Sequence, residues 1–164
     1  NLSVRAGLVG ILAVTAFMIF YYGRLGVIAV FALLVYGIFA LALFKLVPIV
    51  LTLPGIAGFL LSVGMAVDSN ILTFERLKEE LKRGLDFRDA LELGFGRAWD
   101  SIRDANIATL ATSFILFNPL NWPFLHTSGP VRGFAATLAL GVLLSLFTGI
   151  VVTRTLLRVF ARRE

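Results

Sequence analysis

The sequence predicts an all-α membrane protein with five transmembrane helices, and two observations lead to this fold class. Hydrophobic residues make up 59% of the 164-residue chain and charged residues only 15%, whereas soluble domains contain about 45–50% apolar and 25% charged residues. The apolar residues also run in long stretches, and about 20 such residues suffice for a helix to cross the hydrocarbon core of a bilayer. We therefore expect one transmembrane domain over residues 1–164.

The first two spans are predicted over residues 4–22 and 27–46. The first ends at the aromatic pair Tyr21-Tyr22, which is typical of a membrane interface, and a turn with two glycines separates it from the second. Lys45 lies at the end of the second span, where its long side chain can reach the lipid headgroups.

The third span is predicted over residues 54–74, with Pro54 at a favoured first helical position. The connection over 75–103 is too charged to insert into a membrane. Within it, apolar residues recur every four positions and predict a short amphipathic helix: Phe87, Leu91, Phe95 and Trp99. This helix either lies along the inner membrane surface or packs against neighbouring protein.

The fourth and fifth spans are predicted over residues 105–125 and 131–157. The fifth is an uninterrupted apolar run. The fourth contains a stretch with two asparagines and two prolines at 118–123, so a helix that stops near Phe117 is the alternative.

The distribution of basic residues predicts the orientation. Of the 15 lysines and arginines, all but Arg5, Lys45 and Arg132 fall in the turn at Arg24, in the connection over 75–103, or in the C-terminal tail. Because cytoplasmic segments carry the excess of Lys and Arg, these parts are expected in the cytoplasm and the N-terminus of the chain outside.

Asp68 is the residue that most strongly indicates a function. It lies within an otherwise apolar span, and a carboxylate there costs roughly 2.5–3.5 kcal/mol on insertion scales, so such groups usually face a bundle interior or a wet path. We interpret Asp68 as a group that takes up and releases a proton. The alternative is a permanently protonated side chain that joins helices by hydrogen bonds. Small residues on the same helix indicate close helix contact: Gly58, Ser62 and Ala66.

Polar residues also stand at the start of the predicted fourth span. Asp104 would cap that helix or, alternatively, line a cytoplasmic access route to Asp68. Asn106 follows it. Thr109 and Thr112 would hydrogen-bond across to the Asp68 helix or back to their own helix.

Several functional classes are excluded by composition. The chain has no cysteine, one histidine (His126), and no nucleophile elbow, phosphate loop or metal-ligand cluster, so no enzyme and no cofactor is expected, with protons as the coupling ion. An intramembrane aspartyl protease is not expected either, because it would need two membrane carboxylates that share a proton and this chain offers one, Asp68. The net charge of +5 is concentrated at the ends of apolar runs, which does not favour nucleic acid as a partner.

Three stretches carry a family resemblance: LTLPGIAGFLLSVGMAVDSNILTFERLKEEL (51–81), DSIRDANIATL (100–110) and GPVRGFAATLALGVLLSLFTGIVVTR (129–154). They resemble the SecD family of the bacterial Sec export system, within the resistance-nodulation-division superfamily. The resemblance implies that this chain is the five-span C-terminal part of a longer protein that also has a first span and a large outer domain. The segment FNPLNWPFLHTS (117–128) departs from the family pattern and leaves the outer end of the fourth span open.

The resemblance also implies a role. The chain would form half of a two-part core with SecF, fused or separate, in the bacterial inner membrane among its lipids, and would use the proton gradient to help move exported polypeptide out of the SecYEG channel. The matching motifs assign a proton relay to five residues: Asp68, Asn70, Asp104, Asn106 and Thr109. Two alternatives stay open, a related transporter of lipids or hydrophobic small molecules and a structural subunit that braces the channel.

Overall fold

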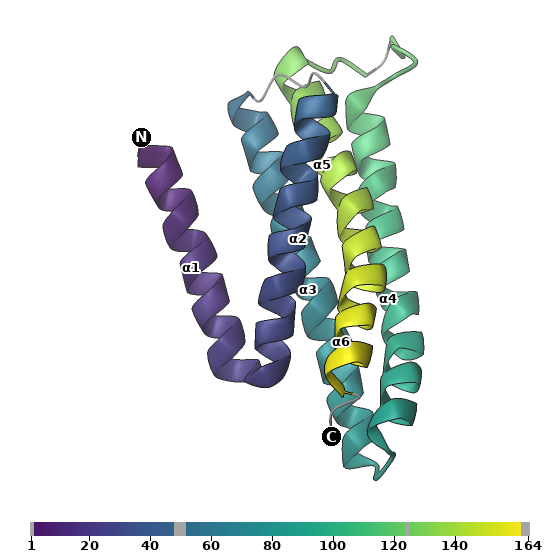
Figure 1. Ribbon diagram of the computed structural model, residues 1–164. Coiled ribbons are helices and arrows are strands. Elements are labelled where there is room, and N and C mark those ends of the chain that lie inside the picture. The colour runs from purple at the N-terminus through teal and green to yellow at the C-terminus, as the bar shows by residue number, and fades with distance from the viewer. Residues whose placement is uncertain (1, 48–51, 124, 162–164) are drawn as a thin grey trace.

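The computed structural model describes residues 2–47, 52–123 and 125–161, and every regular element in these ranges is helical (Figure 1). The helices lie side by side and run alternately up and down, with α3, α4 and α5 in closest mutual contact and α1 packed mainly against α2. The elements in chain order are α1 (Leu2–Tyr22), α2 (Arg24–Leu46), α3 (Leu53–Lys82), α4 (Phe87–Phe117), α5 (Gly129–Phe147), the π-helix η1 (Thr148–Val152) and α6 (Thr153–Ala161).

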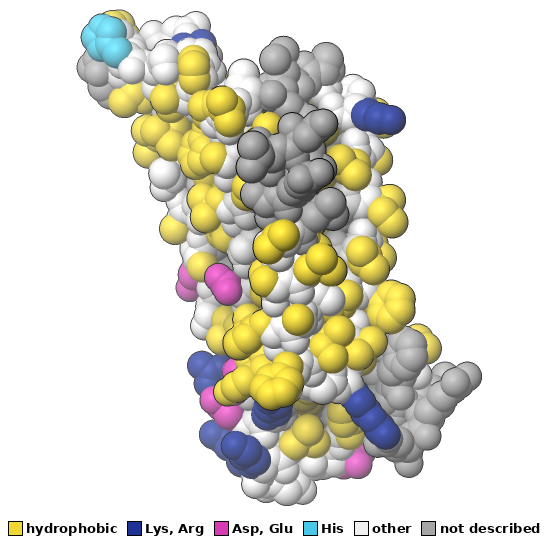
Figure 2. All heavy atoms as spheres, turned by 90° about the vertical axis from the view of Figure 1, so that its left-hand side faces the viewer, with side chains coloured by type: hydrophobic (Ala, Val, Ile, Leu, Met, Phe, Trp, Pro, Cys, Tyr) yellow, Lys and Arg dark blue, Asp and Glu magenta, His cyan; other side chains and the backbone are white. Residues whose placement is uncertain are grey.

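Three helical segments of the described chain are long and apolar enough to cross a membrane: α2, α3, and the continuous rod of α5, η1 and α6 over Gly129–Val159. They correspond to the predicted second, third and fifth spans. The described apolar part of α1, Val9–Tyr22, is shorter, and α4 includes the charged connection, so the first and fourth spans stay predictions. In the view of Figure 2, hydrophobic side chains cover most of the length, and charged side chains gather mainly at the end opposite the histidine.

The charged connection is built differently from the prediction. No separate short helix forms there within the described residues, because the helix that begins at Phe87 continues into the predicted fourth span as α4, one helix of 31 residues. The predicted apolar stripe packs on protein rather than on a membrane surface: Leu91 is buried in a core cluster, and Phe87 and Phe95 pack against that cluster. The amphipathic segment is thus the first half of α4.

The fourth helix ends at Phe117 rather than at Leu125. Asn118 takes the left-handed conformation at the helix C-cap, with φ of 47°, which asparagine adopts more readily than most residues. Its side chain then organises the following turn, because Nδ2 donates to Leu125 O at 2.9 Å and Oδ1 accepts from Trp122 N at 2.9 Å. The polar residues of 118–123 therefore terminate the helix, which is the alternative that the sequence left open.

The predicted small-residue contact on α3 is confirmed and is made with α5. A Cβ added at Gly58 would lie 2.6 Å from the carbonyl oxygen of Phe134, which leaves no room for a side chain. On the same face Ser62 is fully buried and lies 2.7 Å from the Tyr36 hydroxyl of α2. This packing fixes the rotation of α3 about its own axis.

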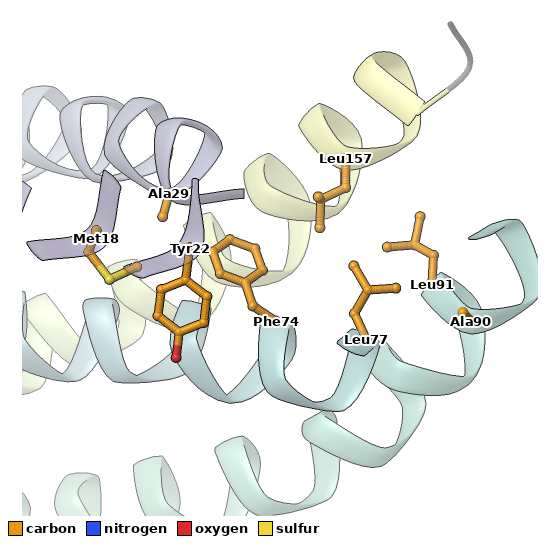
Figure 3. Packing of buried hydrophobic residues seen from close by; sticks show 8 residues of the cluster. All are labelled: Met18, Tyr22, Ala29, Phe74, Leu77, Ala90, Leu91 and Leu157. Carbon is orange, nitrogen blue, oxygen red and sulfur yellow. The ribbon is translucent and has the colours of Figure 1, made fainter. Parts of the chain in front are cut away.

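A hydrophobic cluster joins the helices near the other end of α3. Phe74 and Leu77 are fully buried there, between residues of α1, α2, α4 and α6 (Figure 3). The remaining members of the cluster are Met18, Tyr22, Ala29, Ala90, Leu91 and Leu157. Since both ends of α3 are held by packing, the face that each of its residues presents is set by the fold.

Candidate functional site

Asp68 lies on the outer face of this helix bundle, not in its interior. Along α3, Ser62, Ala66 and Asn70 are buried, whereas Gly64 and Asp68 are exposed. Among the described residues Asp68 has no hydrogen-bond or ion-pair partner. An unpartnered carboxylate facing hydrocarbon is costly, so this face of α3 requires a protein or aqueous environment.

A recess of about 130 Å³ adjoins the Asp68 side chain between α3 and α4. Its lining is Met65, Asp68, Ser69 and Leu72 from α3 and Ser101, Ile102, Ala105 and Asn106 from α4. A water molecule occupies about 30 Å³ in the liquid, so the recess has room for more than one. The structure thus brings together two of the five predicted relay residues, Asp68 and Asn106.

Asn106 is buried, with 2% of its surface exposed. Its Nδ2 donates to the carbonyl oxygen of Ile102 at 2.6 Å, while its Oδ1 is buried without a hydrogen-bond partner in the described structure. Buried polar atoms are nearly always paired. Oδ1 therefore has an unused capacity to accept a hydrogen bond.

Asp104 and Thr109 do not join this arrangement. The Asp104 side chain is 68% exposed and pairs with Arg103 at 3.1 Å, and neither residue lines the recess. The predicted capping role of Asp104 was wrong, because α4 begins at Phe87 with Asp86 at its N-cap. Thr109 donates to Ala105 O of its own helix at 3.0 Å, so the back-bonding alternative is confirmed, and Thr112 does the same to Ala108 O at 2.9 Å.

Asn70 points to a different part of the bundle from Asp68. It is buried, and its Oδ1 accepts a hydrogen bond from Thr153 Oγ1 at 2.8 Å. Thr153 directly follows η1, and its backbone N–H bonds to Thr148 O, five residues back. Such π-helical turns are rare and are frequent at functional sites. Asn70 therefore ties α3 to the irregular part of the last rod.

A larger cavity of about 290 Å³ lies on that side of α3, between α3, α4 and the α5–α6 rod. Ser69 and Ile102 line both this cavity and the Asp68 recess. The polar and charged part of the lining consists of Ser69, Thr73, Ser145, Glu92 and Arg154. The two hollows therefore share part of their lining, and the charged residues Glu92 and Arg154 belong to the larger one.

Chemically, the site offers one carboxyl group, hydroxyl groups and amides around space for water. Carboxyl groups and water can exchange and hand on protons, whereas hydroxyl groups and amides orient them by hydrogen bonds. The described His, Asp and Glu side chains include no group of three that could hold a metal ion. The arrangement thus suits proton transfer.

Sequence reasoning missed Ser69, Thr153 and the buried carboxylate of Glu80. Glu80 is 2% exposed and pairs with Arg97 of α4 at 2.6 Å. A signal for Glu80 was present, because it lies at helical spacing from Asn70, Thr73 and Leu77, which form the buried face of α3. For Thr153 the sequence gives a weaker signal, because a single threonine within an apolar run does not by itself indicate a buried hydrogen bond.

Comparison with known proteins gives concordant results. The family model described as "Protein export membrane protein SecD/SecF, C-terminal" matches residues 2–163. The protein translocase subunits SecD of Thermobaculum terrenum and Dehalococcoides mccartyi are 55% and 54% identical, over 96% and 98% of this chain and 30% and 35% of their own lengths. The chain thus spans about a third of these curated relatives.

Solved structures agree. The crystal structure of SecDF, a translocon-associated membrane protein from Thermus thermophilus, superimposes with a TM-score of 0.90 at 42% identity, over 98% of this chain and 22% of that one. SecDF in its super-membrane-facing form gives a TM-score of 0.89 at the same 42% identity.

Proposed function

This chain belongs to the SecD/SecF family of protein export membrane proteins, and on that premise we propose that it is half of a proton-driven membrane core that promotes polypeptide export, with Asp68 as the proton carrier. The observation that carries the proposal is the place of Asp68. Among the described residues this carboxyl has no partner, and it lies on a helix long and apolar enough to span a membrane, beside a recess with room for water. The family match favours protein export over transport of lipids or small hydrophobic molecules.

The exposed face around Asp68 suggests where a partner half binds. Large apolar side chains on the same side of α3 and along α4 are exposed, among them Leu61, Ile107 and Phe114. A second five-helix half, from SecF, would cover this face and provide the opposite charge that an ionised carboxylate requires away from water. In this proposal the SecYEG channel and the exported polypeptide are the further partners, and the N-terminus lies outside the bacterial inner membrane.

The cycle follows from the environment of the carboxyl. In general, a carboxyl taken out of water favours its neutral form, and a carboxyl that faces a cationic group favours its ionised form. Movement of one half against the other would alternate these environments. Asp68 would then bind a proton in one arrangement and release it in the other, toward the cytoplasm by way of Ser69 and the larger cavity.

The test uses vesicles that contain the complete export machinery, with protein translocation measured in the presence and absence of a proton gradient. We expect Asp68→Asn to leave assembly intact and to remove the part of translocation that the gradient stimulates. The matched control is Asp100→Asn, since that acid is 71% exposed near the end of α4's charged part and lines neither hollow.

The outcomes separate the alternatives. Loss of gradient stimulation in Asp68→Asn, with a normal Asp100→Asn, supports the proposal. Full stimulation in Asp68→Asn would reject it and would favour a structural role in bracing the channel. A partial return of stimulation in Asp68→Glu would further show that an ionisable carboxyl is what this position needs.

A further inference from the structure

We propose that Asn106 is the hydrogen-bond acceptor that holds the proton on Asp68 at the recess that both residues line. This inference deepens the proposed function and rests on it. It makes Asn106 a positioning residue, which sets the pH at which Asp68 changes its charge. The observation behind it is the pairing of an orphaned acceptor with an orphaned carboxyl at one recess.

The chemistry of the amide oxygen decides which form of Asp68 it favours. The orientation of the amide is fixed, because Nδ2 donates to the carbonyl oxygen of Ile102 at 2.6 Å and an oxygen in its place would face another oxygen. Oδ1 is thus the atom left over. It can accept a hydrogen bond from a protonated carboxyl or from water, whereas an ionised carboxylate has no proton to donate. Asn106 therefore stabilises protonated Asp68.

No other charged side chain competes inside the recess. In the described part of the chain its lining comes from α3 and α4, and Asp68 is the only titratable group of that lining. The nearest charged residues on α4 are Asp100, Arg103 and Asp104, which pair with one another at the surface. On α3 the nearest are Glu75 and Arg76, two turns beyond Asp68, and they pair with Lys78 and Glu79. Neighbouring η1 carries none.

The experiment measures the protonated carboxyl of Asp68 by infrared difference spectroscopy as a function of pH. It uses the full-length protein with its partner half in lipid nanodiscs, and Asp68→Asn identifies the band. The test variant is Asn106→Ala. This change removes the acceptor and admits water that solvates the carboxylate, so both effects shift the titration midpoint to lower pH. A shift of about 0.5–1 pH unit is expected for one hydrogen bond.

Ser113→Ala is the matched control. Ser113 lies two turns further along the same buried face of α4 and also has a buried side-chain oxygen without a partner, but it does not line the recess. We expect its titration midpoint to equal that of the wild type. A second readout is the C=O stretching frequency of protonated Asp68, which rises in Asn106→Ala when the hydrogen bond is lost and stays unchanged in Ser113→Ala.

Each outcome has a distinct meaning. A downward shift of the midpoint in Asn106→Ala alone supports the inference. An unchanged midpoint, or an equal shift in both variants, overturns it while Asp68 still titrates and the proposed function stands. If Asp68 of the wild type does not titrate at all, the inference and the proposed function fail together.

Discussion

The Thr153 hydroxyl donates a hydrogen bond to Asn70 Oδ1 at 2.8 Å, across 83 positions of sequence. Both side chains are buried, with 0% and 4% exposed. This bond connects α3, which carries Asp68, to the first residue after the π-helix. The rotation of the Asp68 helix and the irregular turn of the last rod are therefore mechanically linked.

The first prediction concerns this bond. Thr153→Val keeps the shape but leaves the Asn70 oxygen buried without its donor, which typically destabilises a protein by about 1–3 kcal/mol. Thermal unfolding of the purified protein in detergent should show a lower midpoint. Thr155→Val, at an exposed position of the same helix, should leave the midpoint unchanged, and equal effects of the two substitutions would contradict the role assigned to the bond.

The second prediction concerns the contact between α3 and α5. An added Cβ at Gly58 would meet Phe134 O at 2.6 Å, whereas at Gly64, on the exposed face of the same helix, it would meet nothing within 4 Å. Gly58→Ala should therefore separate the helices and lower the unfolding temperature. Gly64→Ala should be neutral or stabilising by up to about 1 kcal/mol, as alanine is the better helix former. Similar losses from both would show that the close contact is not what Gly58 provides.

The third prediction concerns the buried carboxylate of Glu80. Arg97 pairs with it at 2.6 Å, while Arg83 is more distant at 3.4 Å. Removing one partner from a buried ion pair typically destabilises a protein by about 3–5 kcal/mol. We expect Arg97→Met to lower the free energy of unfolding by less than this, because Arg83 still pairs with Glu80. Arg103→Met is the control, because the acids that Arg103 pairs with are 71% and 68% exposed, and exposed pairs contribute about 0–1 kcal/mol. Equal denaturant midpoints for the two variants would contradict the prediction.

Hydropathy placed Asp68 within a long apolar helix. The helices α2 and α3 and the rod of α5, η1 and α6 lie where it predicts the second, third and fifth spans. It did not predict that the amphipathic helix of the charged connection and the fourth span form one continuous helix, because hydropathy reports the surrounding solvent, whereas helix continuity depends on backbone breakers. No proline occurs between Pro54 and Pro119, and Gly94 is accommodated in α4 because it packs closely on Leu77 of α3.

The candidate site was only partly predictable for a related reason. A sequence motif names Asp68, Asn70, Asp104 and Asn106 but not the direction in which each side chain points. That direction follows from how α3 and α4 pack, which places Asn106 at the recess beside Asp68 and leaves Asp104 at the surface. The role of Thr153 depends on the π-helix, which no local pattern in the sequence indicates.

The most direct test of proton transfer by Asp68 is an infrared pH titration of this residue in the assembled protein. If Asp68 carries protons, a carboxyl C=O band that is absent from Asp68→Asn appears on acidification and disappears on alkalinisation within the pH range in which export operates. A band that stays constant throughout that range, or never forms, would contradict the claim that Asp68 carries protons.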